Sequence, residues 1–154
     1  MDTKSILVPF DGSKYSKRAL DEAIKTSKIF DAQLHLMMAV NSPKLEPTAV
    51  VISGVVRGGV NKAINKYVKE MYDRANSIMQ ENVEYCKKRG VEADYKVVPA
   101  IGPAKAILDF AKKKDVDLII MGSQGLRGIK KLKVLGSVSR HVLENAICPV
   151  TIVH

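Results

Sequence analysis

Short apolar segments alternate with helical patterns along the chain, and this alternation limits the folds it can adopt. Strand-like segments are expected at residues 5–10, 33–40, 92–99, 117–121 and 149–153. Regular alternation of strands and helices predicts one parallel sheet with helices on both of its faces. The segment 117–121 is nearly all apolar, as expected for a strand covered on both sides. The sequence therefore predicts an open five-stranded α/β fold.

Four segments carry apolar residues at helical spacing, namely 14–29, 62–89, 103–114 and 136–145. Ser13 is a candidate N-cap for the first helix, and Gly90 is expected to end the second. At 1.5 Å per residue the second helix would be roughly 40 Å long, enough to overhang a small sheet. Residues 41–61 hold two prolines and three glycines. We expect them to form a long connection, either a flap or a partner contact.

Length and composition favour a single domain over residues 1–154. No apolar run approaches the ~20 residues of a membrane span, and the first residues do not resemble a signal peptide. We therefore expect a cytoplasmic protein without a membrane partner. Cys86 and Cys148 form no C-x-x-C pair and are expected to be buried thiols. The histidines are widely spaced, so no metal site is expected.

A glycine-rich stretch with basic residues follows the fourth predicted strand. Gly122, Gly125 and Gly128 come at steps of three, and a basic segment follows at residues 130–133. Gly136 and the next residue then open the last predicted helix. Glycines allow close backbone approach to an anion, and a helix N-terminus offers free N–H groups with partial positive charge. The stretch therefore predicts a phosphate-binding site.

Two common nucleotide motifs are absent. The glycine spacing of Gly54 and Gly59 matches a Walker loop, but Val60 and Asn61 follow where lysine and serine or threonine are needed. The dinucleotide pattern G-x-G-x-x-G is also absent, because the first strand leads into Asp11, Gly12 and Ser13. The chain is therefore predicted to be neither a P-loop NTPase nor an ordinary dinucleotide-binding domain.

Several motifs together resemble the universal stress protein family, in its ATP-binding branch. They are the opening I-L-V-P-F-D-G-S, the segment D-L-I-I-M-G-S-Q-G and the ending C-P-V-T-I-V. The nucleotide-binding motif of the family is G-x2-G-x9-G-[ST]. Its positions are matched in order by Gly122, Gly125, Gly136 and Ser137, except that ten residues rather than nine separate Gly125 from Gly136. The resemblance implies a Rossmann-like, adenine nucleotide alpha hydrolase-like fold with strand order 3-2-1-4-5.

The resemblance also implies a set of nucleotide-binding residues. Asp11 would accept hydrogen bonds from ribose hydroxyls, and Gly122 would touch the ribose. The base would be bordered by Pro9, Val40 and Met121. Phosphates would be held at Gly125, Gly136, Ser137 and Val138. The candidate set is completed by Phe10 and Ser123, and by Arg127 and Lys130, which are added as charge partners from sequence proximity alone.

Simpler interpretations of these residues stay open. Residues 11–13 could form only a turn and a helix cap. Met121 could belong to the core, and Ser137 could be only an N-cap. The lysines at 130, 131 and 133 could lie in a solvated loop.

The leading functional hypothesis is a regulatory or stress-response protein that binds ATP, AMP or ADP, with Mg²⁺ or Mn²⁺ as candidate ions. No catalytic residue and no dedicated metal ligand is evident, so only slow or partner-stimulated hydrolysis is expected. An alternative is an adenylate-transferring or slow ATP-hydrolysing enzyme, but S-G-G-x-D-S is absent after the first strand. The net charge of +9 permits a polyanion ligand, although an aromatic content of 5% disfavours nucleic acid. A homodimer through strand 149–153 is expected, as the resemblance implies, alongside an unknown protein partner.

Overall fold

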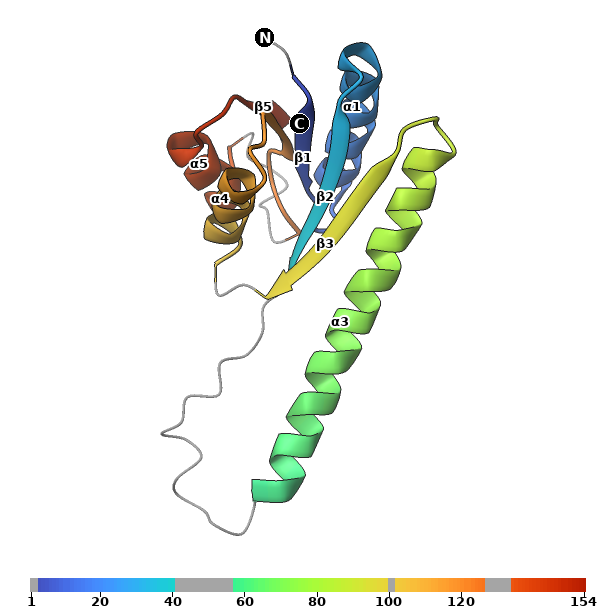
Figure 1. Cartoon of the computed structure of the whole chain (residues 1–154). Helices are drawn as coiled ribbons and strands as arrows, with labels where there is room; N and C mark the ends of the chain where they lie inside the picture. Colours follow the sequence, from blue (N-terminus) through green and yellow to red (C-terminus); the bar gives the residue numbers. More distant parts are fainter. Residues whose placement is uncertain (1–2, 41–56, 100–101, 127–133) are drawn as a thin grey trace.

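A computed structural model describes residues 3–40, 57–99, 102–126 and 134–154, with the backbone alone for 57–61. These residues form one sheet of five parallel strands in the order β3-β2-β1-β4-β5 (Figure 1). The predicted fold class and strand order are confirmed. The elements in chain order are β1 (Ser5–Pro9), α1 (Lys14–Phe30), β2 (Gln33–Val40), α3 (Arg57–Lys87), β3 (Ala93–Pro99), α4 (Pro103–Lys113), β4 (Leu118–Gly122), α5 (Ser137–Asn145) and β5 (Val150–Val153).

Strand β1 lies at the centre of the sheet, between β2 and β4. From β1 the chain first adds β2 and β3 on one side and then returns to add β4 and β5 on the other. The strand order reverses at β1, so the loops that follow β1 and β4 leave neighbouring strands at the same edge. In open parallel sheets this carboxyl edge is where ligands bind.

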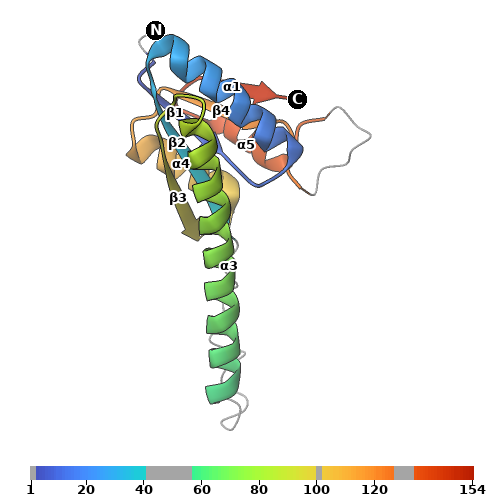
Figure 2. The same ribbon diagram turned by 90° about the vertical axis from the view of Figure 1, so that its right-hand side faces the viewer.

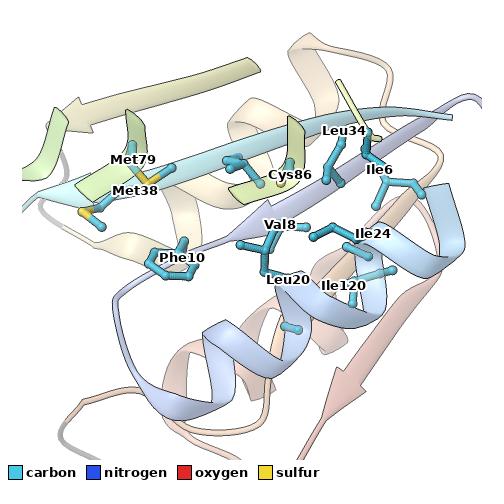
Figure 3. Close-up of a cluster of buried hydrophobic side chains, with 14 of the residues drawn as sticks. Ile6, Val8, Phe10, Leu20, Ile24, Leu34, Met38, Met79, Cys86 and Ile120 are labelled. Atoms are coloured by element: carbon cyan, nitrogen blue, oxygen red, sulfur yellow. The ribbon is translucent and has the colours of Figure 1, made fainter. Parts of the chain in front are cut away.

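Alternate side chains of the strands supply two cores, one on each face of the sheet. One cluster packs α1 and α3 against Ile6 and Val8 of β1, and Figure 3 shows these side chains with Leu20 and Met79 from the two helices. The other cluster packs α4 and α5 against the opposite face, around Leu7. Successive side chains of β1 point to opposite faces of the sheet, so both faces of this strand are buried.

Local capping explains where the first helix begins and ends. The Ser13 hydroxyl accepts a hydrogen bond from the Ser16 amide at 3.1 Å, which confirms Ser13 as the N-cap. Asp31 ends α1 in the left-handed conformation, with φ of 52°. The turn after α3 likewise contains Gly90, with φ of 72°, which suits glycine.

Helix α3 extends far beyond the sheet it covers (Figures 1 and 2). Its 31 residues correspond to about 46 Å, against about 23 Å for the seven residues of β3. Its buried hydrophobic residues among those described are Ala75, Met79 and Cys86, all in the second half. The predicted overhang is confirmed and lies past the carboxyl edge.

Helix α3 begins at Arg57, however, so the expected connection 41–61 is five residues too long. Residues 41–56 lie outside the described part of the chain.

The two cysteines differ in burial. Cys86 is fully buried in the core between α3 and the sheet, and burial raises the pKa of its thiol to about 11. Cys148 is only half-buried, so the expectation of a buried thiol is wrong at this position, although burial still raises the pKa of its thiol. Among the described residues, no helix is long and apolar enough to cross a membrane.

Candidate functional site

Asp11 connects the ends of the neighbouring strands β1 and β4 at the carboxyl edge. It follows β1, and one carboxylate oxygen accepts the Ser13 amide at 2.9 Å. The other oxygen accepts the amide of Leu126, beyond β4, at 3.1 Å. Residues 11–13 therefore form the turn that the simpler interpretation of the sequence proposed. The Asp11 carboxylate also contacts the segment that follows β4. Asp11 stays exposed, so it can accept further hydrogen bonds from a ligand.

A side chain would meet different neighbours at each of the three glycines at and after the end of β4. A Cβ atom on Gly122 would lie 2.7 Å from the Cβ of Tyr15, so the first turn of α1 itself excludes a side chain there. A Cβ on Gly125 would lie 2.8 Å from the Asp11 carboxylate. At Gly136 the nearest atoms would be at 3.5 Å, an ordinary contact. Packing against α1 thus accounts for Gly122 before any ligand is considered, whereas the single close atom at Gly125 is the end of the Asp11 side chain.

The N-terminus of α5 lacks a side-chain cap, and Ser137 is exposed there. Gly136 is its N-cap and offers no side-chain hydrogen bond, in contrast to the Ser13 cap of α1. The alternative that Ser137 is the N-cap is wrong, because Ser137 is the first residue of the helix. The amides of Ser137 and Val138 have no partner within the helix, as in any first turn. These amides carry the positive end of the helix dipole, which favours an anion.

Ser123 joins this helix start to the sheet. Its amide donates to the Val153 carbonyl of β5 at 2.8 Å. Its own carbonyl accepts the Gly136 amide and the Ser139 hydroxyl, both at 2.8 Å. The Ser123 hydroxyl is buried and has no hydrogen-bond partner among the described residues. A buried hydroxyl without a partner is costly, which suits a position that a ligand or water completes.

Gln124 closes the base of the loop between β4 and α5. Its side-chain amide donates to the Val134 carbonyl at 2.8 Å. Sequence reasoning missed Gln124 and Ser139, because their partners lie 10 and 16 residues away. The position of Ser139, three residues after Gly136, was the one available signal, since serine often bonds within a first helical turn.

The apolar candidates are mostly core residues. Phe10 is 3% exposed and packs in the cluster with α1, and Met121 is 4% exposed and packs in the cluster with α4 and α5. Met121 therefore fits the simpler core interpretation, with little surface left to meet a base. Val40 is buried at the end of β2, and Pro9 is half-buried at the end of β1. Both residues stand at the ends of their strands, at the carboxyl edge of the sheet.

The two charged candidates of the loop, Arg127 and Lys130, lie outside the described residues, as does Gly128. Their predicted roles therefore stay predictions. In the part of the chain that the structure describes, no cluster of three or more histidine, cysteine, aspartate or glutamate residues could hold a metal ion.

A hollow of about 720 Å³ lies at the opposite edge of the sheet, where β2 and β3 begin. Its charged lining residues are Lys28 and three carboxylates, Asp31, Glu92 and Asp94. Because carboxylates outnumber the lysine, this surface disfavours a polyphosphate. The carboxyl edge is the better candidate for an anionic ligand.

A family model and individual known proteins all match this chain to the same family. The model of the universal stress protein family matches residues 2–154. Universal stress protein MJ0531 of Methanocaldococcus jannaschii is 34% identical over 151 residues, covering 97% of this chain and 81% of that protein. Universal stress protein YxiE of Bacillus subtilis is 35% identical over 152 residues, covering 96% and 97%.

Solved structures share the fold. Universal stress protein UspA from Lactobacillus plantarum superposes with a TM-score of 0.83 at 21% identity, covering 100% of this chain and 99% of that one. A universal stress protein from Archaeoglobus fulgidus in complex with dAMP has a TM-score of 0.70 at 20% identity, with both chains fully covered. A universal stress protein in complex with cAMP also has a TM-score of 0.70, at 24% identity, covering 100% and 99%.

Proposed function

This chain belongs to the universal stress protein family, and from that premise we propose that it binds an adenine nucleotide, ATP or its products ADP and AMP, as a regulatory protein of the stress response. The observation that carries the proposal is the convergence of three groups at one edge of the sheet. They are the exposed Asp11 carboxylate, the backbone at Gly125 and the open N-terminus of α5. Relatives of the same fold that hold dAMP and cAMP support an adenine ligand.

The chemistry of each group suits one part of a nucleotide. The Asp11 carboxylate can accept hydrogen bonds from ribose hydroxyls. The amides of Ser137 and Val138, with the exposed Ser137 hydroxyl, can hold phosphate oxygens. The main chains at Pro9 and Val40, where β1 and β2 end, can border the base. Gly125 keeps the wall between ribose and phosphates free of side chains.

A regulatory role fits this set better than rapid catalysis. The groups proposed to contact the nucleotide are one carboxylate, one hydroxyl and backbone amides. The carboxylate is already assigned to the ribose, so none of them is placed to orient an attacking water. In our proposal the bound nucleotide changes the surface that Leu126 and the first turn of α5 present to a protein partner.

Isothermal titration calorimetry with ATP tests the proposal. We expect saturable binding of one ATP per chain, with ADP and AMP binding more weakly because they make fewer phosphate contacts. GTP is the control, since its base has a different hydrogen-bonding edge. Denaturing the purified protein should also release an adenine nucleotide, which mass spectrometry would identify. Absence of binding to every adenine nucleotide, with and without Mg²⁺ or Mn²⁺, would reject the proposed function.

A further inference from the structure

Ser139 is a buried serine whose hydroxyl joins α5 to the end of β4. Its side chain lies in the first turn of the helix, and the residue is 3% exposed. The hydroxyl oxygen is 2.8 Å from the Ser123 carbonyl oxygen and 3.0 Å from the Gly136 carbonyl oxygen. A hydroxyl has one proton to donate, and the Ser123 carbonyl is the nearer acceptor. The hydroxyl therefore connects two elements that are 16 residues apart.

The Ser123 carbonyl fixes α5 at two points. It accepts the amide of Gly136, the N-cap, and the hydroxyl of Ser139, which is the third residue of the helix. Ser123 is itself held to β5 through its amide and the Val153 carbonyl. Two attachments restrain rotation of the helix start more tightly than the N-cap bond alone, in addition to the packing of α5 through Val142.

Ser16 of α1 shows that the local bond alone does not explain this arrangement. Like Ser139, it is 3% exposed and stands three residues after an N-cap. Its hydroxyl donates to the Ser13 carbonyl at 3.0 Å, within its own turn. The Ser139 hydroxyl has the equivalent local acceptor in Gly136 and a second one in Ser123. Of these two helices, only α5 therefore uses this serine to join its first turn to another element.

We propose that Ser139 is a positioning residue for the nucleotide phosphates. It touches no ligand, and its hydroxyl holds the first turn of α5 at the angle at which the amides of Ser137 and Val138 face the phosphate oxygens. This inference rests on the proposed nucleotide-binding function. It assigns to Ser139 an effect on phosphate binding that leaves the contacts to base and ribose unchanged.

The test is calorimetry of Ser139→Ala with two ligands, ATP and adenosine. We expect the affinity for ATP to fall by up to roughly tenfold, because the ligand must then restrain the first turn of α5 at a cost bounded by the one buried hydrogen bond that is lost. Adenosine has no phosphate, so its affinity should stay within about twofold of the wild type. The substitution removes one atom, and the Gly136 amide still satisfies the Ser123 carbonyl, so the fold should persist.

Ser16→Ala is the matched control, because it removes an equally buried hydroxyl from the same position of another helix. It should leave the affinity for ATP unchanged. If Ser139→Ala binds ATP as the wild type does, or loses ATP and adenosine equally, Ser139 is not a positioning residue although the proposed function stands. If the wild-type protein binds no adenine nucleotide, the proposed function fails and this inference fails with it.

Discussion

Asp11 and Gly125 depend on each other, because the Asp11 carboxylate occupies the space that a side chain on residue 125 would need. A Cβ there would lie 2.8 Å from the carboxylate oxygen that accepts the Leu126 amide. A shift of that oxygen away from a side chain at 125 would strain the 3.1 Å hydrogen bond from the Leu126 amide. A side chain at 125 would therefore act on the proposed ribose contact as well as on the phosphate contact.

Gly125→Ala should weaken ATP binding by up to about tenfold, since the methyl group would push an Asp11 carboxylate oxygen away from its hydrogen bond with the Leu126 amide. Gly102→Ala is the control, because a Cβ at Gly102, the N-cap of α4, meets nothing within 4 Å. Calorimetry on both variants, with circular dichroism to confirm folding, makes the comparison. Equal affinity in the two variants would contradict the assigned geometry.

At the level of helices and strands, local sequence patterns predicted most of the structure. The strands and helices lie within a few residues of their predicted bounds, because hydrophobic periodicity and capping residues such as Ser13 are local signals. The start of α3 at Arg57 was missed, since Gly58 and Gly59 are weak helix formers and indicated a loop.

The site was less predictable than its elements. The positions of Asp11 and of the α5 N-terminus could be predicted from the ends of strands and helices. The hydrogen bonds between Asp11 and Leu126, and between Ser139 and Ser123, join residues from separate elements. No local pattern encodes such contacts, because they depend on how the elements pack.

The two halves of α3 should contribute differently to stability. Met79 is fully buried against the sheet, whereas Val68 lies in the overhanging half and is partly exposed. Met79→Ala should lower the free energy of unfolding by about 2–5 kcal/mol, and Val68→Ala by less than about 1 kcal/mol. Urea denaturation followed by circular dichroism measures both. Similar losses in the two variants would show that the overhang is packed as tightly as the second half.

At the scale of the whole molecule, β5 leaves one edge of the sheet unpaired within the described chain. It pairs with β4, and the carbonyls of Pro149 and Val153 accept hydrogen bonds from the amides of Ile119 and Ser123. Because backbone groups alternate along a strand, those of Ile152 point away from β4. We propose that this edge pairs with the same edge of a second copy, since an uncovered apolar edge invites association.

Analytical ultracentrifugation should therefore give a mass of twice 16.9 kDa at micromolar concentration. Ile152→Pro should shift the protein toward the monomer, because proline removes an outward-facing N–H while the bonds to β4 remain. A wild-type monomer, or a dimer that is indifferent to Ile152→Pro, would place the association elsewhere.

The central claim, that Asp11 holds the ribose of an adenine nucleotide, is tested most directly by a cycle of two proteins and two ligands. Calorimetry compares ATP with 2′,3′-dideoxy-ATP on the wild type and on Asp11→Ala. We expect the wild type to prefer ATP by at least about tenfold, since hydrogen bonds to a carboxylate are strong. Asp11→Ala should bind the two ligands equally. A preference for ATP that survives in Asp11→Ala would contradict the account.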